Sequence, residues 1–334
     1  MRLPQSPAPR NTRRPLLAAV FGALIAISPT GHTQPTSWPS QPIRLIVSQS
    51  AGGSIDIAAR LLAQRLAEPL GVNVLVDNRP GANGLIAGEA GARASDGHTF
   101  LMTSPSTLTI NQHVYRKLPY DVQRDFTPVT QTTSIAFMLA VNVASPYRNT
   151  DDLIAAARAR PDAVRYASAG IGNQSHLAAE LLAGAAGVKL LHVPYKGEAP
   201  AITDLVGGQV DFIFGTMPAL LAQVRAGKLR ALAVAQPTRA SAAPDVPTAL
   251  EQGLRNVEVT GWTGIVAPVA TPAGAITRLH TEVTRILQIA EVRDTLARAG
   301  AEPVGSSPEQ FGAFIRAETI KWGDAVRRAG IVPE

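Results

Sequence analysis

Residues 43–56, IRLIVSQSAGGSID, pass from an apolar run through a glycine-containing loop into the start of an amphipathic segment. The apolar run is rich in Ile, Leu and Val and predicts a buried strand, and the segment that follows, to residue 70, has helical periodicity. We expect Ser54 to cap this helix, Asp56 to lie in its first turn and Gly71 to end it. The stretch therefore predicts a strand, a loop that a ligand can approach, and a helix.

Strands and helices alternate outward from this stretch. A strand at residues 72–76, a small-residue helix at residues 84–94 and a strand at residues 99–103 complete a βαβαβ unit, which implies a parallel sheet with right-handed crossovers. The same order returns further along the chain. The strands of this second unit are expected at residues 165–169, 189–193, 210–214 and 229–234, and its helices at residues 175–186, 200–206 and 218–226. The sequence therefore predicts two α/β units.

Two further β-rich runs, residues 135–143 and 257–267, lie before and after the second unit. Helices are expected after Thr271-Pro272 and from Ser307, where Gln310 completes a capping box. These helices have no new sheet to cover, so we expect them to pack back on the first unit.

That packing makes the chain cross between domains twice, near residues 140 and 262. The predicted fold is an α/β clamp of two domains joined by two crossing strands, with the ligand in the cleft between them. One domain is expected to comprise residues 38–140 and 262–334, and the other residues 141–261. The alternative is two domains in series followed by a helical tail.

The N-terminal segment explains most of the net charge. Residues 1–33 carry four arginines and no acid, followed by an apolar run of about 12 residues and then by small and polar residues. This order predicts a cleaved signal peptide, because a membrane-spanning helix needs roughly 20 apolar residues. The alternatives are a buried N-terminal helix or a membrane anchor, and the Arg13-Arg14 pair leaves the export route open. Removing four of the 31 basic residues leaves 27 against 25 acidic residues, so the mature chain has a charge of about +2.

The 334 residues and 46% hydrophobic composition are those of a globular protein of one large or two medium domains. Cysteine is absent, which excludes disulfides, thiolate zinc sites, iron–sulfur clusters and a lipidated N-terminal cysteine. Aromatic residues make up 5% and are not interleaved with basic residues, so the sequence offers no support for nucleic-acid binding.

Four loops that follow predicted strands concentrate glycines, hydroxyls and helix starts, at residues 48–56, 104–107, 168–176 and 215–218. Open α/β sheets bind ligands at the carboxyl ends of parallel strands, and a helix N-terminus suits a carboxylate or phosphate. The competing interpretation for the first loop is a tight turn with an N-cap. The candidate ligand-binding residues are Gln49, Ser50, Gly52, Gly53, Ser54, Asp56, Ser104, Ser106, Thr107, Ala169, Gly170, Asn173, Ser175, His176, Gly215 and Thr216. Residues 195–197 either reach the cleft or form a solvated turn, and Trp262 either stacks on a ligand or packs the hinge.

Enzyme signatures are missing from the sequence. Residues 170–175, GIGNQS, are close to a dinucleotide fingerprint, but no acidic residue follows at the spacing that a ribose needs. The chain has no P-loop, no GxSxG and no HExxH motif, and its six histidines lack metal-ligand spacing. The sequence therefore predicts no catalytic set, no cofactor and no metal site.

The chain resembles the solute-binding proteins of the tripartite tricarboxylate transporter family, the Bug receptors. The stretches that carry the resemblance run in the family's order from residue 38 onward: PIRLIV (42–47), AGGSID (51–56), NRPGA (78–82), KLPYD (117–121), YAS (166–168), SHLA (175–178), HVPYKG (192–197), LVGGQVD (205–211), AGKLRALAV (226–234) and DVPT (245–248).

The resemblance implies a periplasmic-binding-protein-like clamp, a periplasmic location and no catalysis. It places the ligand, a small organic carboxylate, against residues 49–54, 104–107, 169–176 and 215–216. The sequence departs from the family pattern at Ser48-Gln49-Ser50, where many members have Pro, an aromatic and a small residue, and at Ile55, where many have Thr.

We therefore expect a periplasmic solute-binding protein that captures a small organic carboxylate for a tripartite tricarboxylate-type membrane transporter. Its expected partners are the acid and the transporter subunits, without nucleic acid, and it is expected to be a monomer. The alternatives are a ligand sensor for a signalling partner, or an enzyme that uses the same cleft.

Overall fold

The computed structural model describes residues 38–333. The predicted signal peptide, residues 1–33, lies outside this range. Within it, no helix combines the length and the hydropathy that crossing a bilayer requires.

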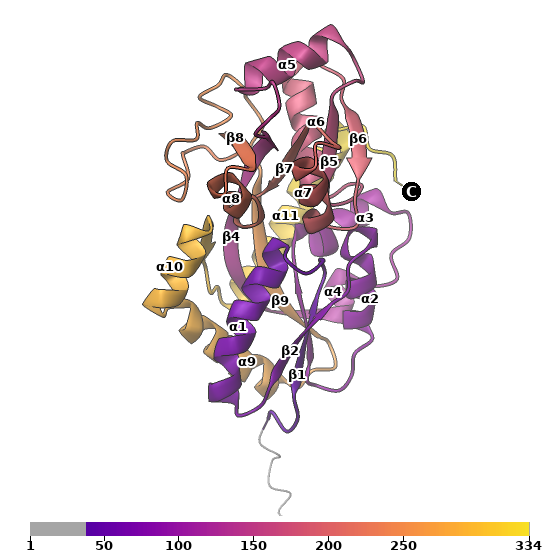
Figure 1. The fold of residues 1–334 in the computed structure, drawn as a ribbon. Coiled ribbons are helices and arrows are strands. Elements are labelled where there is room, and N and C mark those ends of the chain that lie inside the picture. Colours follow the sequence, from indigo (N-terminus) through magenta and orange to yellow (C-terminus); the bar gives the residue numbers. More distant parts are fainter. Residues whose placement is uncertain (1–37, 334) are drawn as a thin grey trace, which may run out of the picture. The chain divides into compact units, whose positions relative to one another are not determined.

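The expected βαβαβ unit is present at the start of the described chain (Figure 1). Strand β1 pairs in parallel with β2 on one side and with β3 on the other, which gives the order β2-β1-β3. Helix α1 ends at Gly71, which adopts a left-handed conformation (φ +68°) as expected. The elements are β1 (Ile43–Val47), α1 (Ser54–Leu70), β2 (Val74–Asn78), a 3₁₀ turn (Ala82–Gly84), α2 (Leu85–Ala92), β3 (Thr99–Thr103), a π-helical turn (Ser106–Ile110), α3 (Asn111–Val114) and α4 (Val122–Asp125).

Strand β4 (Phe126–Asn142) is much longer than the run of residues 135–143 from which we expected it. Its first half contains several threonines and a glutamine, so the apolar pattern by which a buried strand is predicted is absent there. Thr132 and Thr133 are fully buried there because their hydroxyls hydrogen-bond to the hydroxyl of Thr263, at 2.6 and 2.7 Å.

Strand β4 belongs to two sheets. Residues 126–136 pair with β9 (Thr260–Pro268) and, through residues 133–135, with β10 (Ala301–Pro303). Residues 137–142 pair with β7 (Phe212–Thr216) and β8 (Leu229–Val234). We call β2, β1, β3, β9, β10 and the first half of β4 the first sheet, and the remaining strands with the second half of β4 the second sheet. The chain thus changes sheets between residues 136 and 137, and again just before β9.

The second sheet repeats the parallel arrangement of the first. Strand β5 (Arg165–Ser168) lies between β6 (Leu191–Pro194) and β7, parallel to both. The helices of this half are α5 (Thr150–Ala159), α6 (Gln174–Ala186), α7 (Glu198–Val206) and α8 (Met217–Arg225). The two βαβ arrangements joined by β4 and β9 make the molecule a two-domain α/β clamp. The exact domain limits stay a prediction.

The C-terminal helices follow the expectation only in part. Helices α9 (Ala273–Leu287) and α10 (Ala290–Arg298) pack with α1 in a core on one face of the first sheet (Figure 1). Helix α11 (Pro308–Arg328) begins with the expected capping box at Ser307. Its first half packs Phe311 against β9, but Trp322 and Val326 join the core of the second half of the chain. The expectation that all these helices cover the first unit was therefore wrong for the end of α11.

Several strand boundaries differ from the expected ones in the same direction. Strands β2, β6 and β7 begin at Val74, Leu191 and Phe212, two residues later than expected. In each case those two residues belong to the turn that connects the preceding helix to the strand. As a result Gly215 and Thr216 end strand β7 and do not form a loop. Ser54 does not cap α1 either, because Gly53 holds the N-cap position and Ser54 is the first helical residue.

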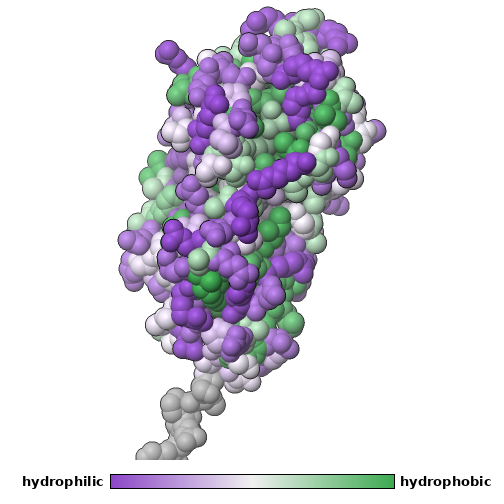
Figure 2. All heavy atoms as spheres, turned by 60° about the vertical axis from the view of Figure 1, so that its left-hand side comes forward, coloured by the Kyte–Doolittle hydropathy of each residue, from purple (hydrophilic) through white to green (hydrophobic). Residues whose placement is uncertain are grey.

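Polar and apolar residues are interspersed on the face seen in Figure 2. The most exposed large apolar side chains of the described part are far apart in the sequence: Leu75, Val269, Ile320 and Val332.

Candidate ligand-binding cleft

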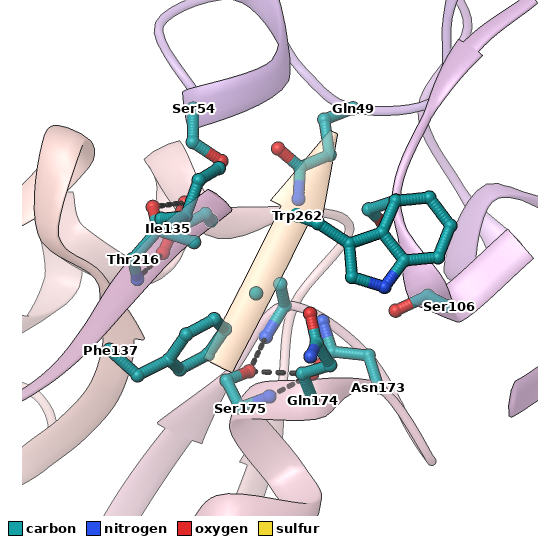
Figure 3. Close-up of a pocket in the computed structure, with 14 residues that line it drawn as sticks. Gln49, Ser54, Ser106, Ile135, Phe137, Asn173, Gln174, Ser175, Thr216 and Trp262 are labelled. Atoms are coloured by element: carbon teal, nitrogen blue, oxygen red, sulfur yellow. Dashed lines mark hydrogen bonds between the residues drawn. The ribbon is translucent and has the colours of Figure 1, made fainter. Parts of the chain in front are cut away.

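A polar pocket lies where the two sheets face each other. It forms at the carboxyl ends of β1 and β3 from the first sheet and of β5 and β7 from the second, which is where parallel strands of α/β folds present their loops. Figure 3 shows Ser54 and Gln49 on one side, Asn173, Gln174 and Ser175 on the other, and Trp262 and Phe137 beside them. The lining residues are Gln49, Ser54, Ser104, Ser106, Ile135, Phe137, Ala169, Asn173, Gln174, Ser175, Glu198, Thr216, Gly261 and Trp262.

A second pocket adjoins the first. It extends the cleft past the 3₁₀ turn and the loop before α7. Its lining residues are Ser48, Gln49, Gly81, Asn83, Gly84, Ser104, Ser106, Thr107, Ala169, Asn173, Lys196 and Gly197. Because the two pockets share Gln49, Ser104, Ser106, Ala169 and Asn173, they are two ends of one cleft.

The loop between β1 and α1 is held by Asp56. One carboxylate oxygen of Asp56 accepts hydrogen bonds from the backbone N–H of Gly52 and from Nε of Arg60, both at 2.9 Å, and the other accepts from Asn78 at 3.0 Å. Burial alone raises the pKa of Asp56, but these hydrogen bonds outweigh it and hold the pKa below its ordinary value. Asp56 therefore fixes the loop and does not line the cleft.

The loop between β5 and α6 is held in a similar way by Asn173. Its side-chain oxygen caps α6 by accepting hydrogen bonds from the N–H groups of Ser175 and His176, at 2.8 and 3.2 Å. The Ser175 hydroxyl donates to the same oxygen at 2.6 Å and accepts from the N–H of Ala169 at 2.9 Å. This network closes the loop into a rigid turn that presents Asn173 and Ser175 to the cleft.

His176 points away from the cleft, into the second half of the molecule. Its Nδ1 accepts a hydrogen bond from the N–H of Gly172 at 2.9 Å, and its ring stacks on His192 with centroids 3.9 Å apart. Burial lowers the pKa of His176 to about 4, and burial together with the neighbouring His176 lowers that of His192 to about 3. The pair is neutral at pH 7 and serves as packing behind the loop.

Glu198, the first residue of α7, places a carboxyl group in the wall of the main pocket and is 2% exposed. It accepts hydrogen bonds from the N–H of Thr216 at 2.5 Å and from the Thr216 hydroxyl at 2.7 Å, and the N–H of Ser54 donates to it across the cleft. Gly215 leaves room for it, since a Cβ there would lie 2.9 Å from Oε1 of Glu198. Burial raises the pKa of Glu198, and the hydrogen bonds oppose this shift.

Trp262 lines the cleft and is also part of the core. Its packing role is thus present, whereas stacking on a ligand stays a prediction. Its ring packs edge-on against Phe311 of α11, and its Nε1 donates to a carboxylate oxygen of Glu318 at 3.1 Å. Glu318 also accepts from Nε1 of Trp322 at 2.7 Å. The orientation of this cleft wall is thus set from α11.

The structure brings many of the predicted residues to the cleft: Gln49, Ser54, Ser104, Ser106, Thr107, Ala169, Asn173, Ser175 and Thr216. The others lie behind it and are absent from both linings: Ser50, Gly52, Gly53, Asp56, Gly170, His176 and Gly215. In the sequence they share the same loops, and only the position of each residue relative to the cleft in the folded chain separates the two groups.

Sequence reasoning missed several residues that line the cleft. Two of them, Ser48 and Gln174, lie in the predicted loops but were not among the candidates. The others lie outside those loops: Ile135, Phe137, Glu198 and Gly261 in the main pocket and Gly81, Asn83 and Gly84 in the second. A signal for Glu198 existed, since an acid directly after HVPYKG begins a helix, but nothing local indicates that it is buried.

The main pocket contains neither lysine nor arginine, and among residues 38–333 no group of three or more histidines and carboxylates is placed to hold a metal ion. Donors in the main pocket are hydroxyl, amide and backbone groups. Lys196 lines the second pocket and is exposed to solvent.

The profile of the family described as "Tripartite tricarboxylate transporter family receptor" matches residues 58–331. The chain belongs to this receptor family. Protein BugT of Bordetella pertussis is 37% identical over 319 residues, which are 94% of this chain and 97% of that protein. A protein from a Pseudomonas species, described by its place in the tcbD-tcbE intergenic region, is 37% identical over 93% of this chain and 92% of its own length.

Solved structures of the receptor family have the same fold. The Rhodopseudomonas palustris protein MatC with bound malate is 32% identical and has a TM-score of 0.81 over 86% of this chain and 99% of its own. The R. palustris protein Rpa4515 with adipate is 36% identical, with a TM-score of 0.86 over 89% and 100% of the two chains. The periplasmic binding protein BugD is 31% identical, with a TM-score of 0.85 over 89% and 100%. The receptor family is thus one of periplasmic binding proteins with a substrate-binding role.

Proposed function

We propose that this receptor captures a small organic carboxylate in the cleft between its two sheets and presents it to a tripartite tricarboxylate-type membrane transporter. The observation that carries the proposal is the main pocket, where hydroxyl and amide groups of both sheets face a common space. Two further findings support a carboxylate as the ligand class. The chain belongs to the receptor family, and the similar R. palustris proteins hold malate and adipate.

The mechanism follows from which groups are free to donate. In the part of the chain that the structure describes, no lysine or arginine lines the main pocket, so a carboxylate in the cleft is to be held by hydroxyls such as those of Ser104 and Ser106, which line both pockets. Charge-assisted hydrogen bonds to a carboxylate are roughly twice as strong as neutral ones, and a water-poor cleft strengthens them further. Asp56 and Asn173 keep the two facing loops in place, which lowers the entropy lost on binding.

The receptor binds its ligand in the cleft without catalysing a reaction on it. It reaches the periplasm after removal of residues 1–33. It acts as a monomer on the subunits of the transporter. Closure of the 169–176 loop over the first sheet is driven by contacts that exist only in the closed state. The ligand should therefore be recovered unchanged after incubation with the protein.

The test is a thermal-stability screen of the purified protein against mono-, di- and tricarboxylic acids, both aliphatic and aromatic, together with amino acids, sugars and nucleotides. A ligand at about 100 times its Kd should add about 2.7 kcal/mol to the free energy of unfolding. The Ser54→Leu variant fills the pocket and should lose this gain, whereas Ser241→Leu, at an exposed loop position, should keep it. Stabilisation by sugars, nucleotides or amino acids, and by no organic acid, contradicts the proposal.

A further inference from the structure

The cleft is chemically different at its two ends. At one end Glu198 is buried in the wall of the main pocket, where neither lysine nor arginine is present among the lining residues. At the other end Lys196 borders the second pocket and makes no ion pair with any described residue. Gly197 separates the two side chains, so residues 196–198 place an ammonium group at one end of the cleft and a buried carboxyl group at the other.

Glu198 already occupies the donors of its own end. Its two oxygens take both the N–H and the hydroxyl of Thr216, and the N–H of Ser54 at the start of α1 also donates to it. A ligand carboxylate at this end would find those donors already taken by Glu198, and the two groups could hydrogen-bond to each other only if one of them kept a proton. A hydroxyl or an ammonium group would instead find an acceptor with free lone pairs.

The opposite end has unused polar groups. Thr107 is 1% exposed, and its hydroxyl has no hydrogen-bond partner. The side-chain oxygen of Gln49, in the region that the two pockets share, is also buried without a partner, and as an acceptor it suits a donor of the ligand and not its carboxylate. A buried hydroxyl without a partner costs free energy, and a bound carboxylate beside Lys196 would satisfy it.

We infer that the cleft selects an acid with one carboxylate and a hydrogen-bond donor at its far end, with the carboxylate toward Lys196 and Thr107 and a hydroxyl or ammonium group on Glu198. This rests on the proposed function and narrows its ligand class. Glu198 disfavours acids that have a carboxylate at both ends. The expected ligands are therefore acids with a hydroxyl or amino group on the carbon farthest from the carboxylate, and not unsubstituted dicarboxylates.

The first experiment uses the unmodified protein and matched pairs of acids measured by calorimetry. Each pair joins a straight-chain dicarboxylate to the acid of equal length that ends in a hydroxyl: malonate with 3-hydroxypropionate, succinate with 4-hydroxybutyrate, glutarate with 5-hydroxyvalerate and adipate with 6-hydroxyhexanoate. For the pair that binds best, the hydroxy acid should bind at least about tenfold more tightly than the dicarboxylate. Equal or tighter binding of the dicarboxylate overturns the inference.

The second experiment changes the carboxylate while keeping its shape. Glu198→Gln retains one acceptor oxygen and adds an N–H donor, so the preference for the hydroxy acid should fall by about tenfold, chiefly through tighter dicarboxylate binding. Glu251→Gln, which removes an exposed carboxylate, should leave the preference unchanged. Lys196→Gln should weaken both members of a pair by the same factor. A preference that does not move in Glu198→Gln overturns the inference, whatever the stability of the variant.

The outcomes separate this inference from the proposed function. If acids bind but the pairs show no preference, or if only aromatic or tricarboxylic acids of the broader screen bind, the receptor role stands and the inference falls. If no acid of any class binds, the proposed function falls and takes the inference with it.

Discussion

At the scale of single residues, the stacked histidines behind the cleft couple the fold to pH. His176 and His192 lie face to face with an interplanar angle of 16°, and the hydroxyl of Ser168 lies 2.6 Å from Nε2 of His192. Tyr166 stacks on the His192 ring at 4.8 Å and donates its hydroxyl to Glu180 at 2.5 Å. A proton on either ring would place a positive charge among buried aromatic rings, which is why the pKa of each histidine is lowered to about 4 and about 3.

We therefore predict that the protein loses stability in mild acid. A histidine in the unfolded chain binds a proton near pH 6.5, while the folded protein keeps both rings neutral down to about pH 4. The unfolded state binds more protons in that interval, so the free energy of unfolding falls as the pH drops, by about 2 kcal/mol for each histidine between about pH 7 and about pH 5.

Urea unfolding at the two pH values measures this loss. The variant His192→Gln should lose about 2 kcal/mol less than the unmodified protein over the same interval, because only one of the two rings remains to titrate. The comparison uses the change with pH, so the packing cost of the substitution cancels. An equal loss in both proteins would show that the ring of His192 is protonated in the folded state.

At the scale of secondary-structure elements, α11 joins the two halves of the molecule and orients one wall of the cleft. Phe311 lies in the core near β9, and Trp322 lies in the core of the second half. Between them, Glu318 is 6% exposed and accepts the indole N–H groups of Trp262 and Trp322. Lys321 pairs with the same carboxylate at 3.1 Å, which compensates part of the cost of burying it.

We predict that Glu318→Ala destabilises the protein and weakens ligand binding together. The substitution leaves two buried indole N–H groups without an acceptor, at a cost of about 1–3 kcal/mol each, and releases Trp262 at the cleft wall. Glu318→Gln is the matched control, because its amide oxygen still accepts a hydrogen bond.

Chemical unfolding and the tryptophan emission of the three proteins check this prediction. Emission should shift in Glu318→Ala as the indoles lose their fixed partner, and remain near that of the unmodified protein in Glu318→Gln. If both variants lose the same stability, the charge of Glu318 stabilises the protein and its role as a shared hydrogen-bond acceptor does not.

At the scale of the whole molecule, the two halves approach each other closely where Gly197, before α7, lies against the loop that follows β1. Gly197, beside the second pocket, has a φ of +121°, and a Cβ there would lie 2.7 Å from the hydroxyl oxygen of Ser50 in the first loop. Gly170 lies beside Asn83, but a Cβ there would make only ordinary contact, 3.8 Å from the Asn83 Cα. The close approach of the halves therefore depends on Gly197.

We predict that Gly197→Ala keeps the fold but prevents full closure. The new methyl group collides with Ser50, and the backbone conformation is one that alanine adopts only under strain of about 1–3 kcal/mol. Ligand affinity should fall at least about tenfold, because contacts made only in the closed state are lost.

Gly208→Ala is the control, since Gly208 also has a positive φ, +71°, but nothing lies within 4 Å of its Cβ position. Its stability should fall by about 1 kcal/mol without a change in affinity. Calorimetry with the acid found in the screen gives the affinities, and solution scattering with and without that acid gives the change in size. Unchanged affinity in Gly197→Ala would mean that the halves need not meet at this glycine for binding.

The local pattern of the chain predicted the elements that have a strong periodic signal. Strand β1, helix α1 with its left-handed glycine, strands β3 and β8, and the capping box of α11 lie where the sequence placed them. Strand β10 and the first half of β4 were not predicted, because β10 is three residues long and the first half of β4 is rich in threonine. Neither has the apolar alternation by which strands are recognised.

The sequence by itself determined the α/β alternation, the resemblance to a receptor family and the loops that surround the cleft, because each depends on residues close together in the chain. Only the tertiary structure decided which loop side chains face the cleft and which lie behind it, as Ser54 and Asp56 illustrate within one helical turn. It also decided that Glu198 reaches across to Ser54, since burial and charge at a site are set by groups distant in sequence. For this reason the ligand class follows from local pattern, whereas the difference between the two ends of the cleft follows from packing.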